Sequence, residues 1–196
     1  MKEIIFATKN KGKIKEIQAI LGSDFIVKTM EEAGINIDVV EDGTTFEQNA
    51  IKKAVEIMNI SQKIVLADDS GLEIDYLNKE PGVYSARYLG EDTPYDIKNK
   101  KIIERLKDAK DNERSARFVS VVALAMPGKE PITVKGTIEG VIAYEPKGEN
   151  GFGYDPIFYI PHLKCTSAEL SLEEKNKISH RGKALKEMKN ILEKMV

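Results

Sequence analysis

Two short segments in the last third of the chain combine aromatic, charged and flexible residues. The first, from Gly148 to Phe158, reads Gly-Glu-Asn-Gly-Phe-Gly-Tyr-Asp-Pro-Ile-Phe, and Ser179-His180-Arg181-Gly182 follows it. Aromatic faces stack on flat heteroaromatic rings, while imidazole, guanidinium and carboxylate groups hydrogen-bond to their edges. A nucleobase is therefore the leading candidate ligand. The candidate base-binding residues are Phe152, Gly153, Tyr154, Asp155, Lys175, His180 and Arg181.

The hydrogen-bond donors of the second segment indicate which base is preferred. His180 and Arg181 could donate to a carbonyl oxygen on the base. Such a site would reject an amino group, because each mismatched buried polar group costs about 1–3 kcal/mol. A purine with a 6-oxo group is therefore preferred over adenine. The other histidine, His162, follows Pro161 in an expected loop and is given no role.

Acidic residues follow an expected buried strand, Ile64–Ala67, in the sequence Asp68-Asp69-Ser70-Gly71. Ligands of open α/β sheets bind beyond the carboxyl ends of strands, and two adjacent carboxylates repel unless a cation or proton lies between them. Mg²⁺ usually takes one or two protein carboxylates, with water and phosphate oxygens. A simple turn is the commoner explanation of this sequence taken alone. A second acidic segment, Glu41-Asp42-Gly43, favours a metal site.

A basic segment lies between the first expected strand and the first expected helix. Backbone N–H groups at a helix start bind anions, and lysines add positive charge there. The spacing is not that of a Walker P-loop, and a solvated surface explains the lysines about equally well. Lys53, on a helix expected to begin near Thr45, could reach the same place. The candidate phosphate-binding residues are Thr8, Lys9, Asn10, Lys11, Gly12, Lys13, Lys53 and Ser70.

Strands and helices alternate in the first third of the chain, which is typical of an α/β sheet. The expected strands are Ile4–Thr8, Phe25–Thr29 and Ile64–Ala67. Ile14, Ile17, Ile20 and Leu21 recur at helical spacing before Gly22, which ends a first helix. Thr44 and Glu47 predict a capping box at the start of a second helix.

The rest of the chain predicts two longer strands and two more helices. Thr93 as cap and Pro94 as first residue begin a charged helix that ends near Lys107. Arg114–Met126 and Ile132–Tyr144 form a β-ribbon around Pro127-Gly128. The last helix begins near Ser179 and carries Leu185, Met188, Ile191, Leu192 and Met195 on one stripe. No repeat or linker interrupts this pattern, so we expect residues 1–196 to form a single domain.

The composition excludes several classes of protein. Thirty basic against 32 acidic residues give a formal charge of −2, without the basic excess typical of proteins that bind nucleic acid polymers. No apolar run is long enough to span a membrane, and the amino terminus lacks the apolar region of a signal peptide. A single cysteine, Cys165, excludes an internal disulfide and fits a reducing compartment. We therefore expect a cytoplasmic protein.

Five motifs occur in order along nearly the whole chain. They are Thr8-x-Asn10-x-x-Lys13, Ala67-Asp68-Asp69-Ser70-Gly71-Leu72, Pro81-Gly82-Val83-Tyr84-Ser85-Ala86-Arg87-Tyr88, Gly151-Phe152-Gly153-Tyr154-Asp155-Pro156 and Glu174-Lys175-Asn176-x-x-Ser179-His180-Arg181. Each alone is modest, but together they are highly specific. The chain resembles the non-canonical purine nucleoside triphosphate pyrophosphatases, the inosine/xanthosine triphosphate "house-cleaning" family. It departs from many members at Lys9, where they have glycine.

This resemblance implies a fold, an assembly and a reaction. The fold would be an elongated central mixed β-sheet flanked by helices, in two lobes with an active-site cleft between them, and the protein would be a homodimer. The reaction would hydrolyse ITP, dITP or XTP to the monophosphate and pyrophosphate, with water attacking the α-phosphorus in the presence of Mg²⁺.

The resemblance also implies roles for the candidate residues. Asp69 would be the general base or would orient the water, and Glu41 and Asp69 would lie near Mg²⁺. We expect Asp69 to be ionised at neutral pH, because an ordinary aspartate titrates near 4. Thr8 to Lys13, Lys53 and Ser70 would hold the triphosphate, and the residues given above would hold the base. Arg87 is a further candidate contact whose partner stays open.

Three other functions compete with this one. A pyrophosphatase of similar fold, such as the Maf type, would act on other nucleotides. A nucleotide sensor would bind without hydrolysis, although a pure binder needs no water-activating carboxylate such as Asp69. A structural scaffold would leave the charged clusters at chain breaks unexplained.

Overall fold

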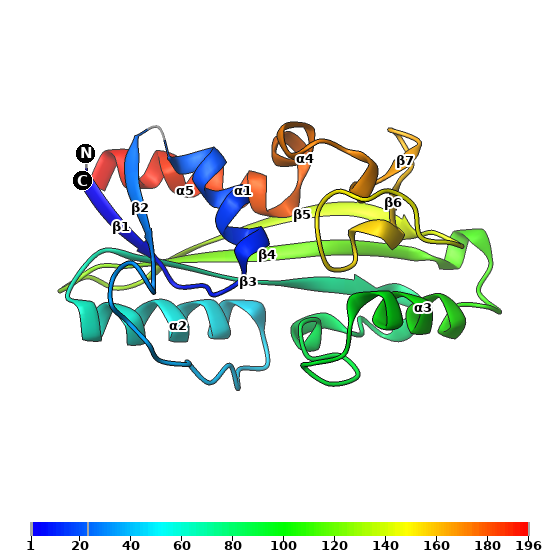
Figure 1. Cartoon of the computed structure of the whole chain (residues 1–196), viewed down its shortest axis with the longest axis horizontal. Coiled ribbons are helices and arrows are strands. Elements are labelled where there is room, and N and C mark those ends of the chain that lie inside the picture. Colours follow the sequence, from blue (N-terminus) through cyan, green and yellow to red (C-terminus); the bar gives the residue numbers. More distant parts are fainter. Residues whose placement is uncertain (1, 23, 196) are drawn as a thin grey trace. The chain divides into compact units, whose positions relative to one another are not determined.

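The computed structural model describes residues 2–22 and 24–195, which fall into two compact units (Figure 1). Unit 1 comprises Met1–Asp69, Ser120–Gly136 and His180–Val196, and unit 2 comprises Ser70–Val119 and Thr137–Ser179. Two units agree with the two lobes expected from the sequence. The cleft between the lobes and the single domain spanning residues 1–196 stay predictions.

The described residues form a seven-stranded mixed sheet with the order β2-β1-β3-β4-β5-β6-β7. β1 is parallel to both β2 and β3, whereas β6 is antiparallel to β5 and β7. The predicted α/β class with a mixed sheet flanked by helices is therefore confirmed. The strands are β1 Lys2–Phe6, β2 Phe25–Thr29, β3 Val65–Ile74, β4 Ser115–Ala125, β5 Ile132–Ile142, β6 Phe158–Ile160 and β7 Cys165–Thr166. The α-helices are α1 Lys11–Leu21, α2 Phe46–Ser61, α3 Tyr95–Arg105, α4 Leu172–Ile178 and α5 His180–Met195.

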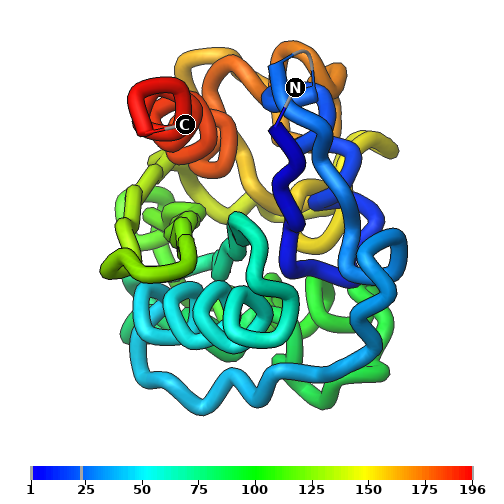
Figure 2. The backbone as a smooth tube through the Cα atoms, turned by 90° about the vertical axis from the view of Figure 1, so that its left-hand side faces the viewer, coloured from blue at the N-terminus to red at the C-terminus, as the bar shows by residue number. Residues whose placement is uncertain are grey.

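Helices cover both faces of the strands in unit 1. α1 and α5 pack against each other on one face, and α2 lies on the other (Figures 1 and 2). The segment between β2 and α2 passes along the side of α2 that faces away from the strands (Figure 2). Three residues of the predicted stripe on α5, Leu185, Met188 and Leu192, are fully buried in the core of this unit. Their spacing of three and four residues places them on one helix face.

The starts of α1 and α2 are capped by side chains. The Asn10 side chain accepts hydrogen bonds from the backbone N–H groups of Gly12 and Lys13 at 2.9 and 3.1 Å. Thr45 caps α2 by accepting from the Gln48 N–H at 3.1 Å. The predicted capping box of Thr44 and Glu47 is therefore wrong by one residue, because the residue directly before the first helical turn, Thr45, has the extended backbone that an N-cap requires.

The Asp-Asp-Ser-Gly sequence is not a turn. β3 continues through Asp68–Gly71 to Ile74, so the expectation that the strand stops at Ala67 is wrong. Turn propensity is a local preference. Here the two carboxylates find partners on helices, and Gly71 and Leu72 are buried, so extended backbone is favoured instead.

Unit 2 contains α3 and α4 together with the second halves of β3 and β5 and the first half of β4. The core contains Leu72, Ile74, Ile102 and Phe158, all fully buried. α3 begins at Tyr95 rather than Pro94, and the Thr93 hydroxyl donates to the Leu89 carbonyl at 2.7 Å instead of capping the helix. The sequence did not predict α4, which a capping box at Ser171 begins. Among the described residues, no helix combines the length and the apolar character needed to cross a lipid bilayer.

An ionic network forms in unit 2 where β3 ends. The Asp75 carboxylate accepts hydrogen bonds from Arg117 at 3.1 and 3.3 Å, from Ser115 Oγ at 2.7 Å and from Lys79. These donors, the Arg117 guanidinium above all, hold the pKa of Asp75 well below its ordinary value. The ionised form therefore stabilises the folded protein above the pKa of an unfolded aspartate, and this stabilisation is lost as the pH falls.

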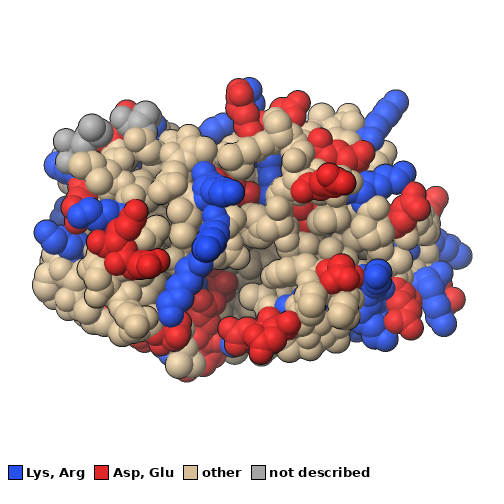
Figure 3. Space-filling view, in the orientation of Figure 1, with Lys and Arg blue, Asp and Glu red and all other residues tan. Residues whose placement is uncertain are grey.

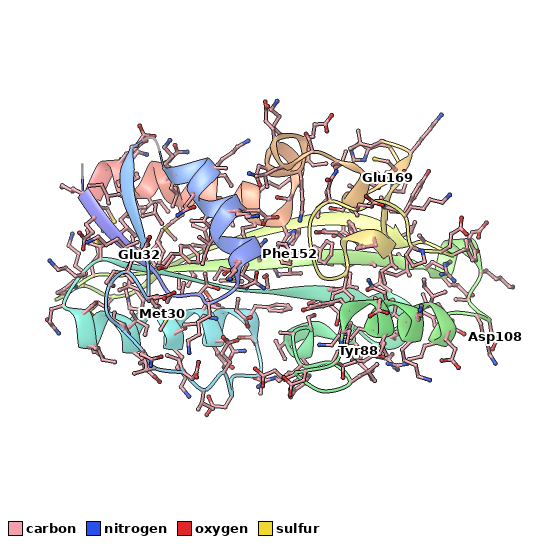
Figure 4. The ribbon with its side chains drawn as sticks, viewed as in Figure 1. Met30, Glu32, Tyr88, Asp108, Phe152 and Glu169 are labelled. Atoms are coloured by element: carbon pink, nitrogen blue, oxygen red, sulfur yellow. The ribbon has the colours of Figure 1, made fainter. Side chains whose placement is uncertain are left out.

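We expect Asp75→Asn to lower the free energy of unfolding at pH 7 by about 1 kcal/mol, or about 2–4 °C in Tm. The difference from the wild-type protein should shrink as the pH is lowered below about 4, because Asp75 then binds a proton in the unfolded chain but not yet in the folded one, where its pKa is lower. Thermal denaturation between pH 3 and 8 measures it. Asp108→Asn is the control, since Asp108 is exposed (Figure 4). A difference that is constant with pH would contradict this role of Asp75.

Candidate active site

Four charged side chains, three of them buried and the fourth, that of Lys13, half-buried, form one cluster in unit 1. Asp68 Oδ2 lies 3.0 Å from Lys13 Nζ and 3.2 Å from Arg181 Nε, and Arg181 Nη1 donates to Glu16 Oε2. Asp68, Glu16 and Arg181 are each at most 2% exposed. Two acids and two bases balance in charge, as buried ions require. The cluster joins α1, β3 and α5.

Burial alone would disfavour the charged forms of these groups. It opposes ionisation of Asp68, but Lys13 and Arg181 outweigh it and hold the pKa of Asp68 well below its usual range. Burial also lowers the pKa of the Lys13 ammonium, and Asp68 offsets part of this effect. Asp68 is therefore an ionised anchor that holds Lys13 in place.

The neighbouring carboxylate, Asp69, has different surroundings. Asn49 Nδ2 donates to Asp69 Oδ2 at 3.0 Å, and Asn49 Oδ1 accepts from the Gly43 N–H at 2.8 Å. Burial and the nearby charge of Glu41 raise the pKa of Asp69 to about 6, against the lowering effect of two lysines. The expectation that Asp69 titrates near 4 is therefore wrong, although at pH 7 and above it is still mainly ionised and is more basic than an ordinary aspartate.

Lys53 holds the second acidic segment. Its Nζ lies 2.5 Å from Glu41 Oε1. Asn49 and Lys53 are four residues apart and so share one face of α2, from which one contacts Asp69 and the other Glu41. The adjacent pair, Lys52 and Asp42, is 2.7 Å apart and more exposed. α2 thus positions both acidic residues predicted to hold a metal.

Glu41 and Asp69 fit a hard divalent cation by their chemistry. They supply carboxylate oxygens, which Mg²⁺ prefers, and in unit 1 the charge of Glu41 already disfavours ionisation of Asp69. A cation between them would relieve this repulsion. Within residues 2–22 and 24–195, no three His, Cys, Asp or Glu side chains gather as a metal-binding group. Mg²⁺ needs only one or two protein carboxylates, so the pair is sufficient.

The lysines of the predicted phosphate-binding segment differ in exposure: one is paired with a buried carboxylate, and two are exposed to solvent. Lys13 is held by Asp68, whereas Lys9 is exposed and pairs with Asp38 at 2.5 Å. Lys11 is exposed. The Thr8 hydroxyl accepts from the Asn10 N–H at 3.2 Å and stabilises the turn before α1. Acidic side chains gather over the segment between β2 and α2, with a row of basic side chains beside them (Figure 3).

The predicted base-binding loop of unit 2 is organised by Asp155. Its Oδ2 accepts from the Phe152 N–H at 2.8 Å and from Lys175 Nζ at 2.6 Å. Lys175 Nζ also lies 4.8 Å from the centre of the Phe152 ring. Gly151 has a φ of +74°, and a Cβ there would collide with the Asp155 carboxylate. Figure 4 labels Phe152 on this loop, between β5 and β6.

Tyr154 does not offer the exposed aromatic face that the sequence predicts. It is 4% exposed, its hydroxyl donates to the Ser85 carbonyl at 2.6 Å, and its ring meets the Tyr95 ring edge-on at 5.2 Å. Burial raises its pKa above the ordinary value. Phe152, which is half-buried, is the ring of this pair that could stack on a ligand.

The predicted site residues divide between the units. Thr8 to Lys13, Glu41, Lys53, Asp69, His180 and Arg181 belong to unit 1, and Ser70, Phe152 to Asp155 and Lys175 belong to unit 2. His180 is buried at the start of α5, and Arg181 is held by two carboxylates. His162 is exposed.

Sequence reasoning missed Glu16 and Asn49. Both had a usable signal, because Glu16 follows Lys13 by three residues and Asn49 precedes Lys53 by four. Each therefore shares a helix face with a residue that was singled out.

Comparisons with known proteins agree with one another. A model of the Ham1 family matches residues 4–191. The chain is 49% identical to the dITP/XTP pyrophosphatase of Bacillus licheniformis, over 98% of this chain and 99% of that protein. It is similar to the structure of the Staphylococcus aureus Ham1 protein, with a TM-score of 0.88 at 44% identity, over 99% of this chain and 100% of that one. It is similar also to a HAM1 protein from Coxiella burnetii, with a TM-score of 0.89 at 43% identity and the same coverage.

We expect Glu16→Gln to lower the free energy of unfolding by about 2 kcal/mol, because Arg181 loses one of its two buried charge partners. Urea or thermal denaturation measures it. Asp38→Asn, which breaks the exposed pair with Lys9, should cost less than about 1 kcal/mol. Equal losses in the two variants would show that burial of the Arg181 cluster contributes nothing.

Proposed function

This chain belongs to the Ham1 family, and we propose that it hydrolyses the deaminated purine nucleotides ITP, dITP and XTP to the nucleoside monophosphate and pyrophosphate. The observation that carries the proposal is the buried Asp69 carboxylate. Asn49 orients it by a hydrogen bond, and the charges of Lys13, Lys53 and Glu41 act on its pKa. Such a reaction would remove deaminated purines from the nucleotide pool.

In the proposed mechanism the chain's own residues position the triphosphate and the water. Asp69 orients a water molecule and accepts its proton as the oxygen attacks the α-phosphorus. The bond from that phosphorus to the bridging oxygen breaks, and pyrophosphate leaves. Mg²⁺, held by Glu41 and Asp69, would supply neutralisation of phosphate charge. Asn49 keeps the Asp69 carboxylate in one orientation.

The triphosphate is proposed to bind the amino-terminal end of α1. Thr8, Lys9, Asn10, Lys11, Gly12 and Lys13 supply backbone N–H groups and positive charge there, and Lys53 and Ser70 add further contacts. Asp68 supports this role because it fixes the Lys13 ammonium at 3.0 Å. Phosphoryl transfer depends mainly on such positioning and charge neutralisation.

The base is proposed to bind Phe152, Gly153, Tyr154, Asp155, Lys175, His180 and Arg181. Phe152 stacks on it, and Asp155 keeps Phe152 and Lys175 together. His180 and a guanidinium fixed by Glu16 and Asp68 donate to the 6-oxo group. We also propose that the protein is a cytoplasmic homodimer that binds neither nucleic acid polymers nor membranes.

A panel of nucleoside triphosphates, with pyrophosphate and orthophosphate detected separately, tests the function. ITP, dITP and XTP should release pyrophosphate at least about 100-fold more efficiently than ATP in kcat/KM, and EDTA should abolish the release. Preference for dTTP or UTP would favour a Maf-type enzyme. Binding of ITP without release of pyrophosphate in the presence of Mg²⁺ would favour a sensor.

We expect Asp69→Asn to lower kcat at least about 100-fold, because the amide cannot accept the proton of the attacking water. Its melting temperature should not fall, since the change removes a carboxylate whose ionisation burial opposes. Steady-state kinetics with ITP and thermal denaturation measure the two effects. Asp42→Asn is the matched control, because Asp42 is exposed and pairs with Lys52. Wild-type kcat in Asp69→Asn would remove Asp69 from the mechanism.

A further inference from the structure

Two polar residues of α3 are buried, whereas Asp96, Lys100, Lys101 and Glu104 of the same helix are exposed. Lys98 is 0% and Asn99 is 3% exposed. Each holds the backbone of a different loop of unit 2. Lys98 Nζ donates to the Ala86 carbonyl at 2.6 Å, and Asn99 Nδ2 donates to the Gly153 carbonyl at 3.2 Å. Neither residue has a part in the mechanism above.

The loop held by Lys98 is itself bonded to the base-binding loop. Ser85, next to Ala86, accepts the Tyr154 hydroxyl on its carbonyl at 2.6 Å. The Ser85 hydroxyl donates to the Gly82 carbonyl at 2.6 Å and accepts from the Leu72 N–H at 2.9 Å. Lys98 therefore fixes a peptide segment that anchors Tyr154.

The loop held by Asn99 is the base-binding loop. Gly153 lies between Phe152 and Tyr154 and has a φ of +68°, which side chains rarely adopt. Tyr95, one turn before Lys98 and Asn99, packs its ring edge-on against Tyr154. The first two turns of α3 thus hold this loop directly, through Asn99 and Tyr95, and indirectly, through Lys98.

These contacts are costly for stability. Burial lowers the pKa of the Lys98 ammonium, while Glu91 offsets part of this effect and the centre of the Tyr95 ring lies 4.8 Å from Nζ. Among the described residues, Asn99 Oδ1 is buried without a hydrogen-bond partner. Desolvation of a buried ammonium costs free energy, and an unsatisfied buried acceptor costs about 1–3 kcal/mol. An apolar side chain of similar length would fill the position of Lys98 at lower cost. Such a replacement would lose the hydrogen bond from Lys98 to the Ala86 carbonyl.

We propose that Lys98 and Asn99 are positioning residues that fix the Phe152–Asp155 loop and thereby determine recognition of the purine base. This inference rests on the proposed function. The two side chains act through backbone carbonyls, so they touch neither the base nor the phosphates. Misplacement of a stacking ring weakens binding of the base, whereas the groups around Asp69 stay in place.

Lys98→Met tests the proposal, because it keeps the length of the side chain and removes its donor. KM for ITP should rise about tenfold while kcat changes less than about threefold. The melting temperature should be equal to that of the wild-type protein or higher. Amide hydrogen exchange, measured by mass spectrometry without nucleotide, should become faster in residues 151–155. Lys100→Met, on the exposed face of the same helix, is the matched control and should leave all four quantities unchanged.

Asn99→Asp is a second variant, which replaces the amide donor by an oxygen facing the Gly153 carbonyl. It should raise KM and loop exchange in the same way, and it keeps the proposal testable if Lys98→Met does not fold. Wild-type KM and loop exchange in the variants that fold, or a KM increase in Lys98→Met that accompanies a fall in its melting temperature, would overturn the proposal.

The two hypotheses fail in different ways. Absence of pyrophosphate release from every purine triphosphate by the wild-type protein would overturn the proposed function and, with it, the link to base recognition. If the wild-type protein releases pyrophosphate, but substitution of Lys98 and Asn99 leaves amide exchange in residues 151–155 unchanged, the positioning role alone is overturned.

Discussion

The organisation of unit 1 depends on one buried carboxylate, that of Asp68. One of its oxygens contacts both Lys13 of α1 and Arg181 of α5, while the strand that carries it is the third in the chain. A buried negative charge is tolerated only with such partners. Three elements that are distant in sequence are therefore tied together by the need to neutralise one group, and Lys13 becomes fixed as a result.

Asp69 shows how strongly the surroundings determine what an aspartate can do. Asp68 and Asp69 are adjacent and chemically identical, yet the pKa of the first lies below the usual range and that of the second is raised to about 6. Two cations contact Asp68, whereas Asp69 accepts a hydrogen bond from the neutral amide of Asn49. The first carboxylate is suited to holding structure together, and the second to accepting a proton or binding a cation.

Patterns of local origin could be predicted from the sequence. The alternating strands and helices of the first third and the apolar stripe of α5 follow from periodicity, and the structure has them. The continuation of β3 through Asp68–Gly71 could not be predicted, because turn propensity is local whereas Arg181, which neutralises Asp68, lies 113 residues away. Lys98 and Asn99 read as ordinary residues of a charged helix. Their burial depends on Ala86 and Gly153, the latter 54 residues distant.

The position of the predicted active site also reflects the alternation of side chains along a β-strand. Asp68 contacts α1 and α5 on one face of the strands in unit 1, and Asp69 contacts α2 on the other (Figure 1). Successive side chains of a strand point to opposite faces, so a shift of β3 by a single residue would turn each carboxylate to the opposite face, away from its own partners. The strand therefore tolerates no insertion or deletion ahead of this pair, and length variation in this part of the chain has to be confined to the loops.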